Sequence, residues 1–118
     1  MKDSNKKIKI AVIYFCYNRV DHLKRSLPKI IEFKNELPLF VFCDGPKNHN
    51  QTETSEVINY VKQSTNNIEN CEIILRENNL GLAKNVILGV SEVFNLGYDA
   101  GKTYLFYHDS SLSKGVTH

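Results

Sequence analysis

The sequence lacks any apolar run long enough to cross a membrane, and its charge is nearly balanced. A membrane-spanning helix needs about 20 consecutive apolar residues. The polar, lysine-rich residues 1–7 are not followed by the apolar core of a signal peptide. A formal net charge of +2 at pH 7 is too small to favour nucleic acid or an anionic membrane as a partner. We therefore expect a cytoplasmic protein with no membrane span and no nucleic-acid partner.

Cysteine is also scarce. The three cysteines, Cys16, Cys43 and Cys71, are odd in number, and each lies in or beside an apolar segment. This pattern favours buried, reduced thiols over a disulfide framework or a metal site. We assign the cysteines no chemistry.

The length of 118 residues allows one small domain with a single core. Hydrophobic residues make up 42% of the chain and charged residues 24%, which is typical of a globular protein. No internal repeat, low-complexity tract or linker divides the sequence. We therefore treat residues 1–118 as one domain.

Apolar segments alternate with amphipathic segments along the chain. Strands are expected at residues 8–17, 38–43, 71–75 and 103–107, and apolar residues recur at helical spacing after each of the first three. Pro28 should kink or divide the first helix, and Gly97 should end the third. Alternation of this kind predicts right-handed βαβ units. The expected fold is an α/β, Rossmann-like three-layer sandwich with a mainly parallel sheet and helices on both faces.

Ligands of such sheets bind beyond the carboxyl ends of the strands. The residues expected there are Tyr17-Asn18-Arg19, Asp44-Gly45, 78–85 and His108-Asp109. The chain has neither a Gly-x-Gly-x-x-Gly motif after the first strand nor a P-loop, which argues against dinucleotide and P-loop nucleotide sites. An aromatic ring can stack on a base, a carboxylate can accept its N–H groups, and a lysine can meet phosphate oxygens.

The most specific stretch is residues 78–85, which joins the third strand to an amphipathic helix. Gly81 lies where the backbone must turn sharply or approach a ligand, and the start of the helix is suited to anions. Lys84 adds a positive charge there. On local chemistry alone, an Asn-Gly turn before an ordinary helix is the commoner explanation.

Taken together, these segments resemble the family 2 glycosyltransferases, which have the GT-A fold and use nucleotide-sugar donors. The matching pieces are Cys16-Tyr17-Asn18-Arg19, where the family often has Thr-Tyr-Asn-Arg, then Asp44, then Asn79-x-Gly81-x-x-x-Asn85 with Lys84 before the asparagine. The resemblance covers nearly all of the chain. It implies a partial GT-A fold that binds a nucleotide sugar, with a UDP-sugar as the expected donor, for glycosyl transfer in polysaccharide biosynthesis.

The resemblance also implies roles for individual residues. Tyr17 and Asp44 would contact the base, usually uracil, and Lys84 would assist. Arg19, Gly81 and Asn85 would belong to the same nucleotide site. Without the resemblance, Tyr17 could equally be a core aromatic residue and Asp44 a turn-forming residue.

The chain departs from the family after the fourth strand. The family places two or three consecutive acidic residues there, and the last binds Mg²⁺ or Mn²⁺ through the donor diphosphate. This chain has Tyr107-His108-Asp109, so only Asp109 matches. Because a lone carboxylate beside a histidine is a poor site for a hard cation, we expect weak metal dependence.

In that family the acceptor site and catalytic base follow the acidic motif, and this chain ends soon after Asp109. We therefore expect the donor half of a transferase, incapable of full transfer alone. The alternatives are a non-catalytic α/β module that binds a protein, and a sugar nucleotidyltransferase-like domain. Residues 103–108 would form an exposed apolar edge strand, and we expect a homodimer through that edge.

Overall fold

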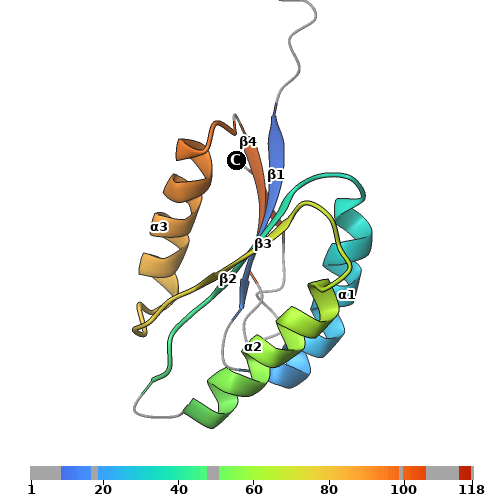
Figure 1. The fold of residues 1–118 in the computed structure, drawn as a ribbon. Helices are drawn as coiled ribbons and strands as arrows, with labels where there is room; N and C mark the ends of the chain where they lie inside the picture. The colour runs from blue at the N-terminus through green and yellow to red at the C-terminus, as the bar shows by residue number, and fades with distance from the viewer. Residues whose placement is uncertain (1–8, 17–18, 48–50, 99, 106–114, 118) are drawn as a thin grey trace, which may run out of the picture.

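The structure is a computed structural model, and it describes residues 9–16, 19–47, 51–98, 100–105 and 115–117. Strands and helices alternate along most of the chain (Figure 1). The elements are β1 (Ile10–Cys16), α1 (Val20–Lys34), β2 (Leu39–Cys43), α2 (Gln51–Thr65), β3 (Cys71–Leu75), α3 (Leu82–Asn95), β4 (Ala100–Leu105) and β5 (Gly115–Thr117). None of the helices in these ranges is long and apolar enough to cross a membrane.

The strands form one sheet in the order β3-β2-β1-β4-β5. The pairs β1–β2, β2–β3 and β1–β4 are parallel, and β5 is antiparallel to β4. The chain moves outward from β1 to β3 and then returns to the other side of β1 with β4. This reversal is the topological switch point of a doubly wound sheet, where ligands bind at the carboxyl ends of the strands. The predicted α/β fold with a mainly parallel sheet is confirmed.

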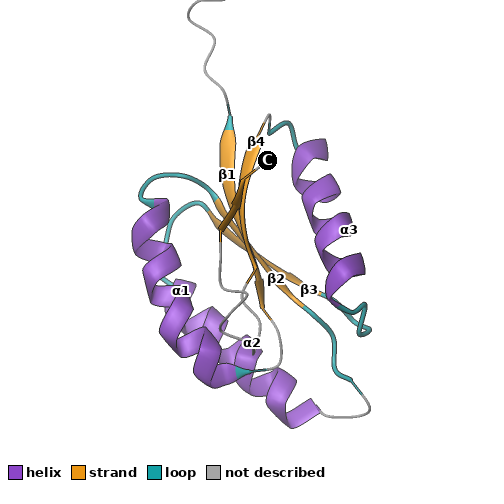
Figure 2. Ribbon diagram, turned by 180° about the vertical axis from the view of Figure 1, so that it is seen from behind, coloured by secondary structure: helices purple, strands orange, loops and turns teal. Residues whose placement is uncertain are grey.

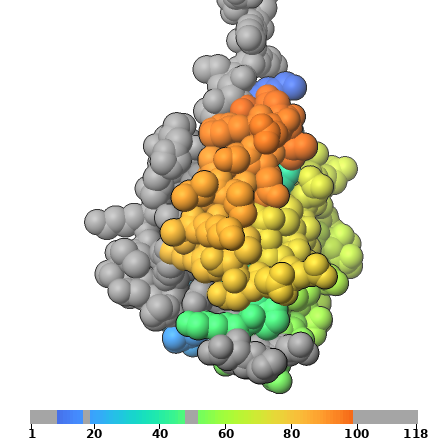
Figure 3. All heavy atoms as spheres, turned by 90° about the vertical axis from the view of Figure 1, so that its left-hand side faces the viewer, coloured from blue at the N-terminus to red at the C-terminus, as the bar shows by residue number. Residues whose placement is uncertain are grey.

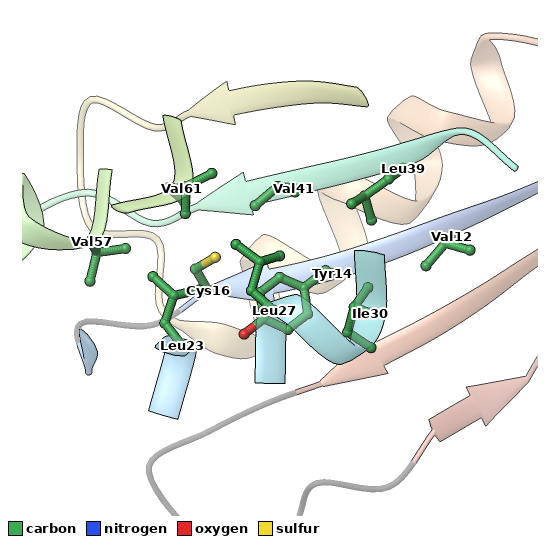
Figure 4. Close-up of a cluster of buried hydrophobic side chains, with 11 residues drawn as sticks. Val12, Tyr14, Cys16, Leu23, Leu27, Ile30, Leu39, Val41, Val57 and Val61 are labelled. Atoms are coloured by element: carbon green, nitrogen blue, oxygen red, sulfur yellow. The ribbon is translucent and has the colours of Figure 1, made fainter. Parts of the chain in front are cut away.

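Helices cover both faces of the sheet, with α1 and α2 on one face and α3 on the other (Figure 2). Alternate residues of β1 therefore point into two separate cores. Val12, Tyr14 and Cys16 pack against α1 and α2, as Figure 4 shows, whereas Ala11, Ile13 and Phe15 belong to the cluster beneath α3. Burial on both faces explains why β1 and β2 are apolar at almost every position.

Pro28 was expected to kink or divide the first helix, and it does not divide it. α1 is continuous from Val20 to Lys34 with Pro28 inside it. Leu23, Leu27 and Ile30 are buried on both sides of the proline. Packing of this apolar face offsets the backbone hydrogen bond that proline cannot donate.

The expectation of an exposed edge strand at 103–108 is wrong for the residues that the structure describes. Residues Lys102, Thr103 and Tyr104 pair with Thr117, Val116 and Gly115 of β5. The expectation assumed that no later segment joins the sheet, and β5 does so. β4 also begins earlier than predicted, at Ala100, and residues 106–108 lie outside the described residues. The described sheet therefore ends at β3 on one side and at β5 on the other.

A buried lysine organises the amino-terminal edge of the sheet. Lys34, in the last turn of α1, is only 3% exposed. Its Nζ atom donates to the carbonyl oxygens of Asn35, Leu37 and Glu69, each at 3.2 Å. The ammonium group thus satisfies all three of its donors and ties the α1–β2 connection to the segment before β3.

α3 approaches the sheet closely at Gly89. A Cβ atom on Gly89 would lie 2.7 Å from Cε1 of Phe15 and 3.3 Å from Cε1 of Phe42. These two buried rings stack on each other, with centroids 5.1 Å apart and an interplanar angle of 20°. Neither ring can move without disturbing the core beneath the helix.

We predict that Gly89→Ala destabilises the protein, although alanine favours helices. The overpacking costs about 1–3 kcal/mol, and the better helix propensity returns about 1 kcal/mol. The net loss in the free energy of unfolding should be on the order of 1 kcal/mol, measured by urea denaturation. Ser91→Ala, at an exposed position of the same helix, is the control and should be neutral or stabilising. A Gly89→Ala protein as stable as this control would contradict the close packing.

Candidate functional site

The carboxyl-terminal edge of the sheet brings together the segments expected to bind a ligand. β1, β2 and β3 end there, and α1, α2 and α3 begin nearby, because each helix follows a parallel strand. The positive ends of the three helices therefore lie along one edge. Five of the residues expected in the site lie within the described ranges: Arg19, Asp44, Gly81, Lys84 and Asn85. Tyr17 and Asp109 lie outside the described residues.

Asp44 directly follows β2 and is only 4% exposed. Its Oδ1 atom accepts the backbone N–H groups of Gly45 and Leu80, each at 2.8 Å. Its Oδ2 atom accepts the N–H of Gly81 at 3.1 Å and the side-chain amide of Asn79 at 3.3 Å. One carboxylate thus fastens the loop between β3 and α3 to the end of β2.

These four N–H groups fill the acceptor capacity of Asp44, because an ionised carboxylate offers about four lone-pair sites. The geometry therefore shows the turn-forming role that the sequence left open for this residue. Contact with a base stays a prediction, and it requires one of the four donors to give way. Asn79 is the donor best suited to do so, because its bond to Asp44 is the longest and its Nδ2 atom also donates to Gly45 O at 3.0 Å.

Two glycines allow the two loops to touch. A Cβ atom on Gly45 would lie 2.4 Å from the carbonyl carbon of Asn78, so the backbones are in direct contact. Gly81, the residue before α3, has φ 79° and ψ 161°. This conformation is essentially restricted to glycine. Gly81 therefore shapes the start of α3, as the sequence predicted for a sharp turn.

Asn85 lies in the first turn of α3 but faces the interior, and it is 2% exposed. Its Oδ1 atom accepts the Nε–H of Arg76 at 3.0 Å. The same guanidinium donates twice to Glu92, at 2.6 and 3.2 Å, and lies over the Phe42 ring. Asn85 thus holds the beginning of the loop against α3.

Sequence reasoning selected Asn85 and missed Arg76 and Glu92. Asn85 and Glu92 are seven residues apart, which places them on one face of a helix. That spacing was the available signal. The spacing does not reveal Arg76, the third residue of this hydrogen-bonded cluster. Arg76 lies before the turn at Gly81 and contacts Asn85 and Glu92 only because the chain reverses there.

Lys84 is exposed in the first turn of α3. The first N–H groups of a helix have no partner within the helix, and no acidic residue occupies the first turn of α3. This end of α3 therefore combines a helix dipole with a lysine charge. Both favour an anionic group such as a phosphate.

Arg19 is the residue directly before α1. Its Nη2 atom lies 3.8 Å from Oδ2 of Asp21, and both side chains are largely exposed. Arg19 also lines a small cavity of about 90 Å³ together with Glu53 and Glu56. Among the described residues, no hydrogen bond or ion pair joins Arg19 to Asp44 or Lys84. The structure therefore joins Asp44, Gly81 and Asn85 by hydrogen bonds, whereas Arg19 lies beside Asp21, Glu53 and Glu56.

The cysteines carry no evident chemistry. Cys16 and Cys43 are buried neighbours on adjacent strands, and all three cysteines are free. Burial, reinforced by Cys43, raises the pKa of the Cys16 thiol well above its ordinary value. A thiol with such a pKa is a poor nucleophile and a poor metal ligand near neutral pH.

Within the described ranges, no group of three or more His, Cys, Asp and Glu side chains is placed to hold a metal ion. The residue expected to bind Mg²⁺ or Mn²⁺, Asp109, lies outside those ranges. Weak metal dependence therefore stays a prediction.

Comparisons with protein-family models, with curated proteins and with solved structures found no match. The fold itself defines the class: a doubly wound α/β protein. At the carboxyl edge of its sheet, Asp44 and Gly45 are hydrogen-bonded to residues 79–81, and we call these residues the loop cluster.

We predict that Asp44→Ala loosens the loop before α3. The amides of Leu80 and Gly81 lose their acceptor, which costs about 1–3 kcal/mol per buried group. Their hydrogen-exchange rates, measured by NMR, should rise by about tenfold or more. Glu77→Ala removes an exposed carboxylate from the same loop and should leave these rates unchanged. Equal protection of Leu80 and Gly81 in wild type and Asp44→Ala would refute this role for the carboxylate.

Proposed function

We propose that the chain binds a nucleotide sugar, with a UDP-sugar as the expected donor, as the donor-binding domain of a GT-A-type glycosyltransferase. One observation carries the proposal. Asp44 and the segment Asn79–Gly81, which the family resemblance selects independently and which lie far apart in the sequence, are joined by direct hydrogen bonds. They meet at the carboxyl edge of a doubly wound sheet, the usual ligand-binding edge of such folds.

In this proposal the diphosphate binds at the first turn of α3. The exposed Lys84 and the first-turn N–H groups, which have no partner within the helix, supply positive charge there. The loop cluster fixes the position and direction of that turn. Phosphate binding therefore depends on Gly81 and Asp44 indirectly, through the path of the backbone.

The base lies toward the ends of β1 and β2 in this arrangement, with Tyr17 stacking on it. Asp44 contributes in one of two ways. In the first, its carboxylate loses the long hydrogen bond from the Asn79 side chain and accepts the N3–H of uracil instead. In the second, it acts only by holding the loop. The first role gives uridine specificity, and the second gives none.

We predict that UDP binds more tightly than CDP or ADP in calorimetric titrations. Uracil offers an N3–H to the carboxylate of Asp44, whereas the N3 of cytosine carries no hydrogen. The difference should be about 1–3 kcal/mol, the range for leaving a buried polar group unpaired. Equal affinity for the three nucleotides would exclude base recognition by Asp44, and no binding of any of them would contradict the proposed function.

The same titration separates the phosphate site from the base site. Lys84→Ala should weaken UDP several-fold and leave uridine unaffected, because only the nucleotide carries phosphates. Lys62→Ala makes the same charge change at an exposed position of α2 and should have no effect. Loss of uridine binding in Lys84→Ala would show that Lys84 supports the base or the fold instead.

We further predict that any Mg²⁺ or Mn²⁺ dependence of UDP binding is weak and runs through Asp109. A single carboxylate provides few of the oxygen ligands that these ions require. Titrating UDP affinity against Mn²⁺ should show a small effect in wild type and none in Asp109→Asn. A strong metal effect that survives the substitution would place the metal at other residues.

A further inference from the structure

Within the part of the chain that the structure describes, β3 is an edge strand with no further strand beside it. The carbonyl of Asn70 and the N–H of Arg76 are bonded to β2. Because these groups point to opposite sides at successive residues of a strand, the N–H and C=O groups of Cys71, Ile73 and Leu75 point away from β2. Such a row of backbone donors and acceptors is a template for a further strand.

An apolar groove of about 310 Å³ adjoins this edge, between the sheet and α3. Its apolar lining is Phe40, Phe42, Ile74, Val93 and Leu96, and the polar side chains of Glu72, Glu92 and Asn95 also line it. Leu96 is 61% exposed, and Leu75, on the strand itself, is 45% exposed. Figure 3 shows this side of the molecule, with α3 in yellow to orange. Exposed apolar surface beside an unpaired strand edge is typical of a surface that binds another protein.

The sequence of the edge has few of the features that usually protect a free strand from pairing. Residues 71–75 contain no proline and no lysine, and Glu72 is their only charge. Since Ile73, Ile74 and Leu75 all favour strands, the edge is well suited to pair with another strand.

A second copy of β3 matches this edge in one antiparallel register. With Ile74 on the two-fold axis, Glu72 lies opposite Arg76 of the second copy, and Ile73 lies opposite Leu75. Both members of the Ile73–Leu75 pair have outward-facing backbone groups, so they form the hydrogen-bonded pairs of the ladder. The register centred on Ile73 would instead place the charge of Glu72 opposite Ile74.

We propose that β3 is a homodimer interface, in which two copies pair antiparallel about Ile74 and continue the sheet across the two-fold axis. Charge complementarity selects a second copy as the occupant, because the edge carries both members of the Glu72–Arg76 pair. The Arg76 guanidinium gives three of its five N–H groups to Asn85 and Glu92, and among the described residues the other two are left for Glu72 of the second copy. The apolar groove and Leu75 add contact area on the two faces of the joined sheet. The inference stands independently of nucleotide binding, since none of its contacts involves a nucleotide.

The first test is the assembly state of the full chain, measured by sedimentation velocity from micromolar concentrations upward. Wild type should dimerise. Glu72→Lys places a lysine opposite Arg76 in both halves of the interface and should raise the dissociation constant by about tenfold or more at low salt. Glu72 is exposed, so its replacement should leave the fold intact. Glu32→Lys, on the exposed surface of α1, makes the same charge change elsewhere and should leave the dimer unchanged.

The second test fixes the register by cross-linking in a Cys71→Ser background. Ile74→Cys places two thiols opposite each other on the axis, at a non-hydrogen-bonded pair, where side chains are closest. Oxidation with diamide should link them as a dimer, the two thiols giving two protons and two electrons to the reagent. Ile73→Cys, which is on the axis only in the other register, and Ser55→Cys, on the exposed surface of α2, should link much more slowly. A monomeric wild type, an unaffected Glu72→Lys dimer or preferential linking at Ile73→Cys would each overturn the proposal.

Discussion

The carboxylate of Asp44 is the contact on which the carboxyl edge of the sheet depends. A loop outside a sheet must find partners for its backbone N–H groups. Here the end of β2 supplies those partners for Leu80 and Gly81, through the two oxygens of one side chain. The direction in which α3 leaves the edge follows from this contact, because Gly81 is both an Asp44 partner and the residue before the helix.

This arrangement separates residues that build the edge from residues that are available to a ligand. Asp44, Gly81 and Asn85 are engaged within the protein, and their side chains or amides already have partners. Lys84 belongs to the same motif but is exposed to solvent. The sequence of residues 79–85 suggests a single binding site. In the structure, most of these residues hold the loop and the start of α3 in place, and Lys84 is the charged residue that they leave exposed. If the proposed nucleotide site is correct, substitutions in the residues that hold the loop would act on the ligand through the path of the backbone.

The sequence predicted most of the fold because β1 and β2 are buried on both faces, which produces apolar runs that helices do not share. It could not predict that α1 continues through Pro28, since tertiary packing of Leu23 and Leu27 decides that outcome. It also missed β5, whose Gly-Val-Thr is too short to carry a pattern. The Arg76–Asn85–Glu92 cluster was out of reach because its members meet only after the turn at Gly81.

Arg76 links the loop cluster to the edge of the sheet. It extends β3 by one residue through its bond to Cys43 O, and its guanidinium holds Asn85 and Glu92 on α3. In the proposed dimer, the same guanidinium also meets Glu72 of the second copy. An ordered loop holds Arg76 in place, and in the proposed dimer this would favour pairing at β3, because less side-chain entropy would be lost. By thermodynamic linkage, pairing at β3 in the proposed dimer would stabilise the loop by the same free energy.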